Sequence, residues 1–139
     1  MRALIAAAIA ATAGGAVAYA QQWTPPTPKN LQVLPKDTPP RAVVATMRSF
    51  AQGLGVRCVF CHVSKGSNPD DLNSFDFASD EKEDKKTARV MLRMVMSVND
   101  QLKGVGDPAP AGELKVTCYT CHRGEKEPLT KKPETPPAN

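Results

Sequence analysis

The sequence predicts a small, mainly α-helical domain, in which two units of helix, turn and Cys-x-x-Cys-His motif stand between extended proline-rich arms. Two segments carry apolar residues at helical spacing, one motif follows each segment, and prolines gather near both ends of the chain. The 139 residues suffice for one domain. We expect residues 41–124 to form this domain, residues 21–40 an N-terminal arm, and residues 125–139 a tail rich in lysine and proline.

The two motifs read Cys58-Val59-Phe60-Cys61-His62 and Cys118-Tyr119-Thr120-Cys121-His122. Cysteines three residues apart share one side of a helical turn, so both thiols can form thioethers with the vinyl groups of one haem. The histidine that follows then binds the iron as proximal ligand. All four cysteines and both histidines of the chain belong to these motifs. The pattern predicts two covalently bound haem c groups, each with its iron.

Three other chemistries use paired cysteines. The four cysteines could form two disulfides in an exported chain, each pair could be a thiol redox centre, or both pairs could bind one zinc ion. Zinc ribbons usually separate their pairs by about 15–20 residues, whereas Cys61 and Cys118 lie much further apart. None of these sites requires a histidine directly after both pairs, which favours haem.

Residues 1–20 resemble a secretory signal peptide. A short basic start is followed by an apolar run, and Ala18-Tyr19-Ala20 matches an A-x-A cleavage site. The run is short for a membrane span, so we expect no transmembrane span in the mature chain, although a retained anchor is the alternative. The prediction places the protein outside the cytoplasmic membrane, in the periplasm, either soluble or peripherally attached to the membrane.

The charge composition does not by itself predict nucleic-acid binding. Without Arg2 the mature chain has 17 basic and 14 acidic side chains, and two haems would add about four propionates that offset this excess. Nucleic acid is therefore not an expected partner. Aromatic residues are 5% of the chain, which is little for a core, and two apolar haems would supply the missing buried surface.

The first predicted helix starts near Thr38 as N-cap and ends at Gly53 or Gly55. Its apolar stripe consists of Val43, Met47, Phe50 and Leu54. Met47 lies in the middle of this stripe. A helix methionine usually belongs to the core, but each iron needs a sixth ligand and the chain has no other histidine.

Residues 63–78 are expected to form a loop, followed by a second helix with Asp80 and Glu83 as its capping box and an end at Gly104. Residues 81–86 are expected to be a solvated first turn. Met91 lies near the centre of the helix stripe, Met94 on its flank, and Met96 faces elsewhere. On geometry, Met91 is the best second distal ligand and Met94 the reserve. The stripe consists of Ala88, Met91, Val95, Val98 and Leu102.

Residues 88–94, Ala-Arg-Val-Met-Leu-Arg-Met, and residues 116–124, Val-Thr-Cys-Tyr-Thr-Cys-His-Arg-Gly, resemble one haem-pair half of the cytochrome c subunit of photosynthetic reaction centres. The resemblance extends over roughly residues 31–124. It implies a helix–turn–Cys-x-x-Cys-His architecture with axial methionines at Met47 and Met91, and electron donation to a photo-oxidised pigment pair. The chain has two motifs where the family has four, and it lacks the family's lipid-anchoring cysteine and extra distal histidine.

These observations predict an electron carrier, not an enzyme, whose haems have His/Met ligation. The metal ligands would be His62 with Met47 and His122 with Met91. The expected partners are redox proteins: a membrane-bound reaction centre or another cytochrome. The alternatives are a peroxidase-like dihaem enzyme or a haem-based ligand sensor, in which one iron is open. No histidine remains outside the motifs for acid–base catalysis.

Overall fold

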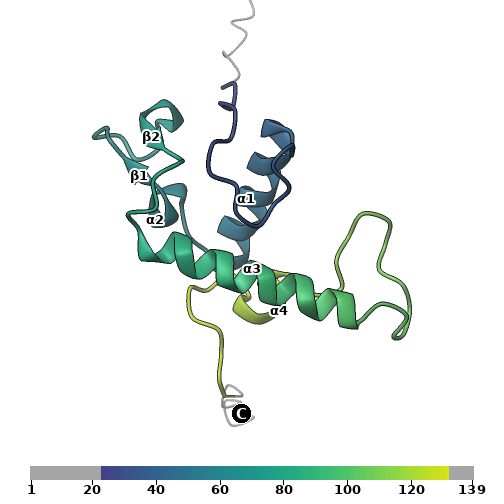
Figure 1. The fold of residues 1–139 in the computed structure, drawn as a ribbon. Helices are drawn as coiled ribbons and strands as arrows, with labels where there is room; N and C mark the ends of the chain where they lie inside the picture. Colours follow the sequence, from purple (N-terminus) through teal and green to yellow (C-terminus); the bar gives the residue numbers. More distant parts are fainter. Residues whose placement is uncertain (1–22, 132–139) are drawn as a thin grey trace, which may run out of the picture.

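The computed structural model describes residues 23–131. The predicted signal peptide, its cleavage site and the end of the predicted tail therefore lie outside the described residues. The elements in chain order are α1 (Pro40–Leu54), α2 (Cys58–Cys61), β1 (Val63–Ser64), the 3-10 helix η1 (Leu72–Ser74), β2 (Phe75–Asp76), α3 (Glu83–Gln101) and α4 (Cys118–His122). The protein is mainly α-helical, as the sequence predicts (Figure 1).

Helix α1 directly follows Pro39, and Pro40 occupies its first turn, where a missing N–H is harmless. The N-cap is Pro39 and makes no side-chain cap, so the prediction of Thr38 as N-cap is wrong. The Thr38 hydroxyl instead donates to the Pro35 carbonyl at 2.7 Å. The helix ends at Gly55, which takes the left-handed conformation with φ 64°, in agreement with the predicted end.

Helix α3 begins later than predicted, because Lys82 is its N-cap and Asp80 lies outside the helix. The Asp80 carboxylate forms ion pairs with Lys85 and Arg89 and therefore does not cap. The predicted loop 63–78 contains a small hairpin, in which Val63 pairs with Asp76 and Ser64 with Phe75. No helix among residues 23–131 has the length and apolar character needed to cross a membrane.

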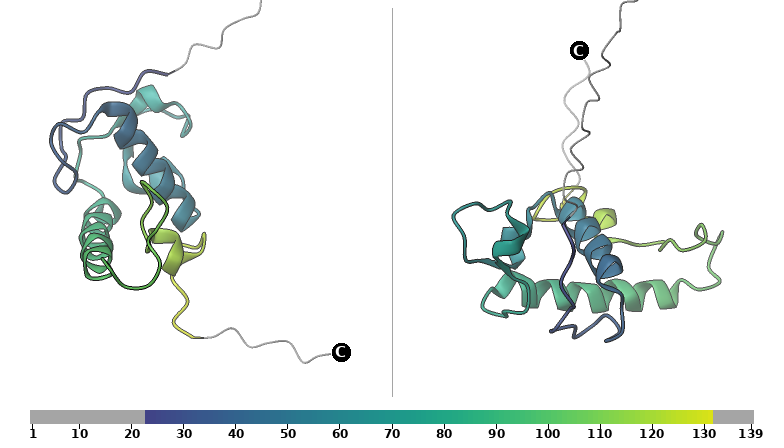
Figure 2. Two further views of the ribbon diagram at one scale, coloured as in Figure 1. Left: turned by 90° about the vertical axis from the view of Figure 1, so that its right-hand side faces the viewer. Right: turned by 90° about the horizontal axis from the view of Figure 1, so that it is seen from above.

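The four helices pack as two pairs, and each pair joins one helix of the first unit (α1, α2) to one helix of the second unit (α3, α4). The helix of the first unit, α1, packs mainly on α4, which carries the second motif, while α2 packs on α3. The two views of Figure 2 show α4 beside the C-terminal end of α1. Gly53 makes this approach possible, since a Cβ there would lie 2.9 Å from the Cβ of Cys118. The Gly124 N–H also donates to the Gly53 carbonyl at 3.0 Å.

The protein part of the core is small. Among the described residues only Phe75 and Val95 are buried apolar side chains. Met91, Met94 and Val90 on α3 keep more than two fifths of their surface exposed. Burial of apolar surface is the main favourable term in folding, so this arrangement leaves much of the apolar surface of α3 available to a large apolar group.

Candidate haem sites

The second motif forms the helical turn α4, closed at its start by a capping box. Thr117 and Thr120 bond reciprocally, with the Thr117 N–H donating to the Thr120 hydroxyl at 3.0 Å. The turn brings the Cys118 and Cys121 thiols and the His122 imidazole to one region, and no disulfide joins the cysteines. One turn of helix thus delivers two thiols and one imidazole together.

The His122 ring is oriented by backbone carbonyls. Its Nδ1 lies 3.1 Å from the Glu125 oxygen and 3.0 Å from the Lys126 oxygen. Carbonyls only accept hydrogen bonds, so Nδ1 carries the proton and donates it. The lone pair is then on Nε2, which is the arrangement typical of a histidine that binds a metal.

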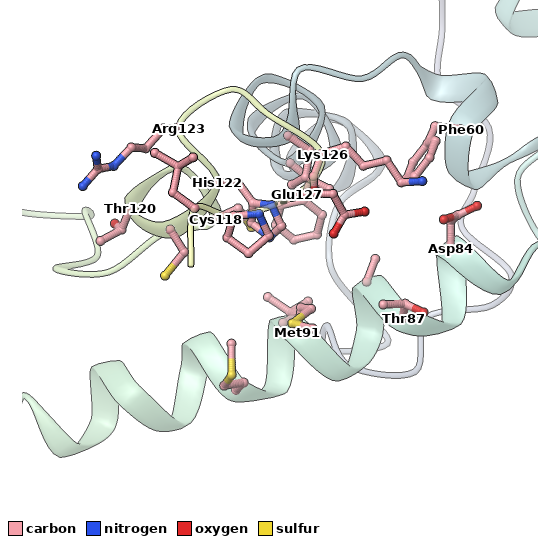
Figure 3. A pocket seen from close by; sticks show the side chains of 18 of the residues that line it. Phe60, Asp84, Thr87, Met91, Cys118, Thr120, His122, Arg123, Lys126 and Glu127 are labelled. Carbon is pink, nitrogen blue, oxygen red and sulfur yellow. Dashed lines mark hydrogen bonds between the residues drawn. The ribbon is translucent and has the colours of Figure 1, made fainter. Parts of the chain in front are cut away.

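A large hollow opens between α3 and α4, which we call the α3–α4 hollow (Figure 3). Its volume is about 990 Å³, at the upper end of the range for ligand pockets. In Figure 3 Met91 points from α3 toward the side of the hollow that holds Cys118 and His122. The hollow is lined by residues from all four helices, which include Phe50 and Leu54 from α1, Phe60 and Cys61 from α2, Ala88, Met91, Leu92 and Met94 from α3, and Cys118, Cys121 and His122 from α4.

The first motif forms α2, after which His62 adopts an extended conformation. The His62 ring meets the Phe77 ring edge-on, with 5.1 Å between centroids, and Phe77 stacks on Phe75 at 5.5 Å. The His62 Nδ1 is buried and has no hydrogen-bond partner among the described residues. Burial, with the positive charges of Lys85, Arg89 and Lys82, lowers the pKa of His62 to about 4. The ring is therefore neutral, the form that binds metals.

Cations surround the first site. The Lys85 side chain is buried, and its ammonium donates to the carbonyls of Phe77 at 2.9 Å, Ala78 at 3.2 Å and Ser79 at 2.6 Å. It also pairs with Asp80 at 3.0 Å. The prediction of a solvated first turn over residues 81–86 is therefore wrong at Lys85. This ammonium fixes the loop that carries Phe77 against His62.

The Cys118 thiol does not resemble the attacking thiol of a redox-active pair. Burial raises the pKa of the Cys61 thiol, and the negative charge of Asp84 raises it further. Burial also raises the pKa of the Cys118 thiol. The attacking cysteine of a thiol–disulfide enzyme has a lowered pKa, so the raised pKa of Cys118, the first cysteine of its motif, favours the haem interpretation over a thiol redox centre at the second motif.

The methionines considered as distal ligands lie at different places relative to the α3–α4 hollow. Met91, the first choice, and Met94, the reserve, both line the α3–α4 hollow with the second motif. Met96 lines a separate hollow with the loop that follows α3. Met47 is half-buried on α1 and is not among the residues of the α3–α4 hollow, although its neighbours Phe50 and Leu54 are.

The residues present fit a covalently held haem. The second site offers two free thiols, an imidazole with an available Nε2, a thioether on the facing helix and a largely apolar wall. Sequence reasoning missed Phe77, Lys85 and Arg89, which support the first site. The alternation of Phe75 and Phe77 is a strand signal that could have indicated the hairpin.

The family model described as "Photosynthetic reaction centre cytochrome C subunit" matches residues 68–134. The chain is also 32% identical, over 91 residues, to the photosynthetic reaction center cytochrome c subunit of Rubrivivax gelatinosus. The resemblance to the reaction-centre cytochrome c family is confirmed. The alignment with the Rubrivivax protein covers 60% of this chain and 23% of the relative, so the chain spans about a quarter of that relative's length. No solved structure matches the chain significantly.

The match to the reaction-centre cytochrome model includes all of α3 and α4, and hence Met91 and the second motif. It begins after His62, so the first motif lies outside the matched segment. Similarity to a cytochrome c family implies covalently bound haem c. The number of haems is inferred from the two motifs.

Proposed function

We propose that this chain is an exported dihaem cytochrome c that carries single electrons, with a reaction centre or another cytochrome as its redox partner. The arrangement around His122 carries the proposal. There two thiols, an oriented imidazole and a facing thioether converge on one apolar hollow. When bound, haem supplies a reversible one-electron Fe(III)/Fe(II) couple.

The residues of the chain divide the work around that couple. Cys118 and Cys121 would anchor the group covalently, and the Nε2 atom of His122 would bind the iron. Met91 would supply a sulfur from α3, on the facing wall of the hollow. Phe50, Phe60 and Leu92 give the hollow an apolar wall, and an apolar wall together with a methionine ligand would favour the reduced iron. With His122 and Met91 both holding the iron, no open site for a substrate would remain on it.

The same division is proposed for the first site, with Cys58 and Cys61 as anchors and His62 as proximal ligand. Met47 is its distal ligand by the family resemblance. The buried, neutral imidazole of His62 supports this role. Export is supported by the signal-like residues 1–20, because haem is joined to c-type cytochromes outside the cytoplasmic membrane.

The distal ligands separate a carrier from an enzyme or a sensor. In the holoprotein a bound methionine gives a weak near-infrared band when oxidised and strongly upfield methyl signals when reduced. We expect two such sets of signals and no binding of carbon monoxide by the reduced protein. Met47→Ala should remove one set and Met91→Ala the other, and each should open one iron to carbon monoxide.

Met96→Ala is the matched control on the same helix as Met91, and it should leave both sets intact. If Met94→Ala removes the second set in place of Met91→Ala, the carrier function holds with the reserve ligand. Binding of carbon monoxide by the unmutated reduced protein would contradict the carrier and support a peroxidase-like enzyme or a ligand sensor.

A further inference from the structure

The two proposed proximal histidines differ at Nδ1, the ring nitrogen that would not bind the iron. The His122 Nδ1 donates to two carbonyls, at 3.1 Å and 3.0 Å. The His62 Nδ1 has no partner among the described residues and lies buried beside the Phe77 ring. The motifs are alike in sequence, so this difference comes from the residues that follow them.

The backbone after the second motif turns left-handed twice in succession. Arg123 has φ 55° and Gly124 has φ 83°, a conformation that glycine adopts without strain. This reversal directs the Glu125 and Lys126 carbonyls at the His122 ring. After the first motif His62 is extended and the chain continues into β1. Val63 is β-branched and does not take a left-handed conformation readily, so the carbonyls there join the hairpin.

A hydrogen bond from Nδ1 strengthens the histidine as a ligand. Donating the Nδ1 proton to an acceptor raises the basicity of the other ring nitrogen. A more basic ligand stabilises Fe(III) relative to Fe(II), which lowers the reduction potential, and hydrogen bonding by the outer shell is a recognised control of haem potential. His122 is therefore the stronger electron donor of the two histidines.

Formal charge does not separate the two sites, because three cations and two carboxylates surround each. At the first site they are Lys82, Lys85, Arg89, Asp80 and Asp84. At the α3–α4 hollow they are Arg123, Lys126, Lys131, Asp84 and Glu127. The side chains of Lys85 and Arg89 are only 10% and 13% exposed, whereas the three cations of the hollow are exposed and screened by water and salt. The buried cations therefore raise the potential of the first haem relative to the second, which adds to the difference made by the histidines.

We propose that the left-handed turn at Arg123–Gly124 sets the potential of the second haem below that of the first. In the half-reduced protein the electron then rests on the first haem, whose iron passes from Fe(III) to Fe(II) by taking one electron from an external reductant. The inference rests on the proposed function. It makes Gly124 a positioning residue, which acts on the iron through His122.

The test is a stepwise reduction of the holoprotein with dithionite and redox mediators, followed by optical spectroscopy. Cys58→Ala and Cys118→Ala each leave one vinyl group unreacted on one haem, which moves the absorption band of that haem to longer wavelength and so labels it. The shifted band should appear in the first reduction step of Cys58→Ala and in the second step of Cys118→Ala. The expected separation is about tenfold in the equilibrium constant, or about 59 mV for one electron.

Gly124→Ala tests the turn itself. A Cβ at Gly124 meets only the Tyr119 ring, at 4.0 Å, so the substitution strains the left-handed backbone without a clash. The separation between the two potentials should narrow, and the His122 Nδ1 proton of the reduced protein should exchange faster with solvent. Gly124→Asn should restore both properties, because asparagine tolerates this conformation. Gly112→Ala places the same strain at φ 82°, in a loop with nothing within 4 Å, and should change neither.

A reversed order of the labelled bands would overturn the inference. So would an unchanged separation in Gly124→Ala after the Nδ1 proton has lost its protection. Neither result would affect the proposed carrier. A protein without two covalent haems would contradict the proposed function itself, and the two failures are therefore distinguishable.

Discussion

The first and second motifs share one sequence pattern but depend on different supports. The first motif, in α2, packs on α3, where the buried Lys85 ammonium ties down the loop that carries Phe77. The second motif, in α4, packs on α1, where Gly53 allows a close backbone approach. Five residues define the attachment chemistry of each motif, while residues outside the motif determine how its histidine is oriented.

The largest effect should come from the cysteines. The double variant Cys58→Ala/Cys61→Ala should lose the first haem and keep the second, and Cys118→Ala/Cys121→Ala should do the reverse. Haem content per chain, measured by the absorbance of the pyridine complex, should halve in each case. A variant that loses all haem would show that the two sites form only together, which would contradict separate supports for the two motifs.

Lys85→Ala should destabilise the fold around the first motif. It leaves three carbonyls and the Asp80 carboxylate without their ammonium donor, and lost hydrogen bonds to a charged group cost about 1.5–3 kcal/mol. We expect a loss of this size in the free energy of unfolding, measured with urea. Lys86→Ala is the matched control, because Lys86 makes one exposed pair with Glu83, and it should cost less than about 0.5 kcal/mol.

Gly53→Ala should weaken the contact between α1 and the second motif. The new Cβ would lie 2.9 Å from the Cys118 Cβ and 3.1 Å from the Tyr119 nitrogen, and overpacking costs about 1–3 kcal/mol. Alanine recovers up to about 1 kcal/mol of helix propensity, so we expect a net loss of about 1 kcal/mol. Gln52→Ala, at an exposed position of the same helix, should not reduce stability. An equal effect of both variants on stability would show that the close approach at Gly53 does not support the second motif.

The smallest effect concerns acid stability of the first region. A hydrogen bond from Arg89, with others from groups that include Lys85, holds the pKa of Asp80 well below its usual range. A lowered folded-state pKa gives stability that is complete above the unfolded pKa, about 3.9, and is lost as the pH falls below it. Asp80→Asn should therefore be less stable than the unmutated protein at pH 7, and the difference should shrink toward pH 2. A difference independent of pH would contradict this role.

Much of the helical architecture could be predicted from the sequence, because it depends on local patterns. The apolar stripes located α1 and α3, and Gly55 ended α1 as expected. The placement of Met91 beside the second motif agrees with its position in the stripe. The burial of Lys85 could not be predicted, because its partners are carbonyls of a loop outside its own helix. Asp80 matched a capping box locally, yet its ion pairs with Arg89 and Lys85 override that pattern.

The central claim is that the chain carries two covalent haems, and the intact mass of the protein tests it most directly. The full chain should be produced in a bacterium that attaches haem in its periplasm, purified, denatured and weighed. We expect the mass of the chain from Gln21 plus two haems, both retained after extraction with acidified acetone. A mass that corresponds to the chain without haem, to the chain with disulfides or to the chain with a single haem would contradict it.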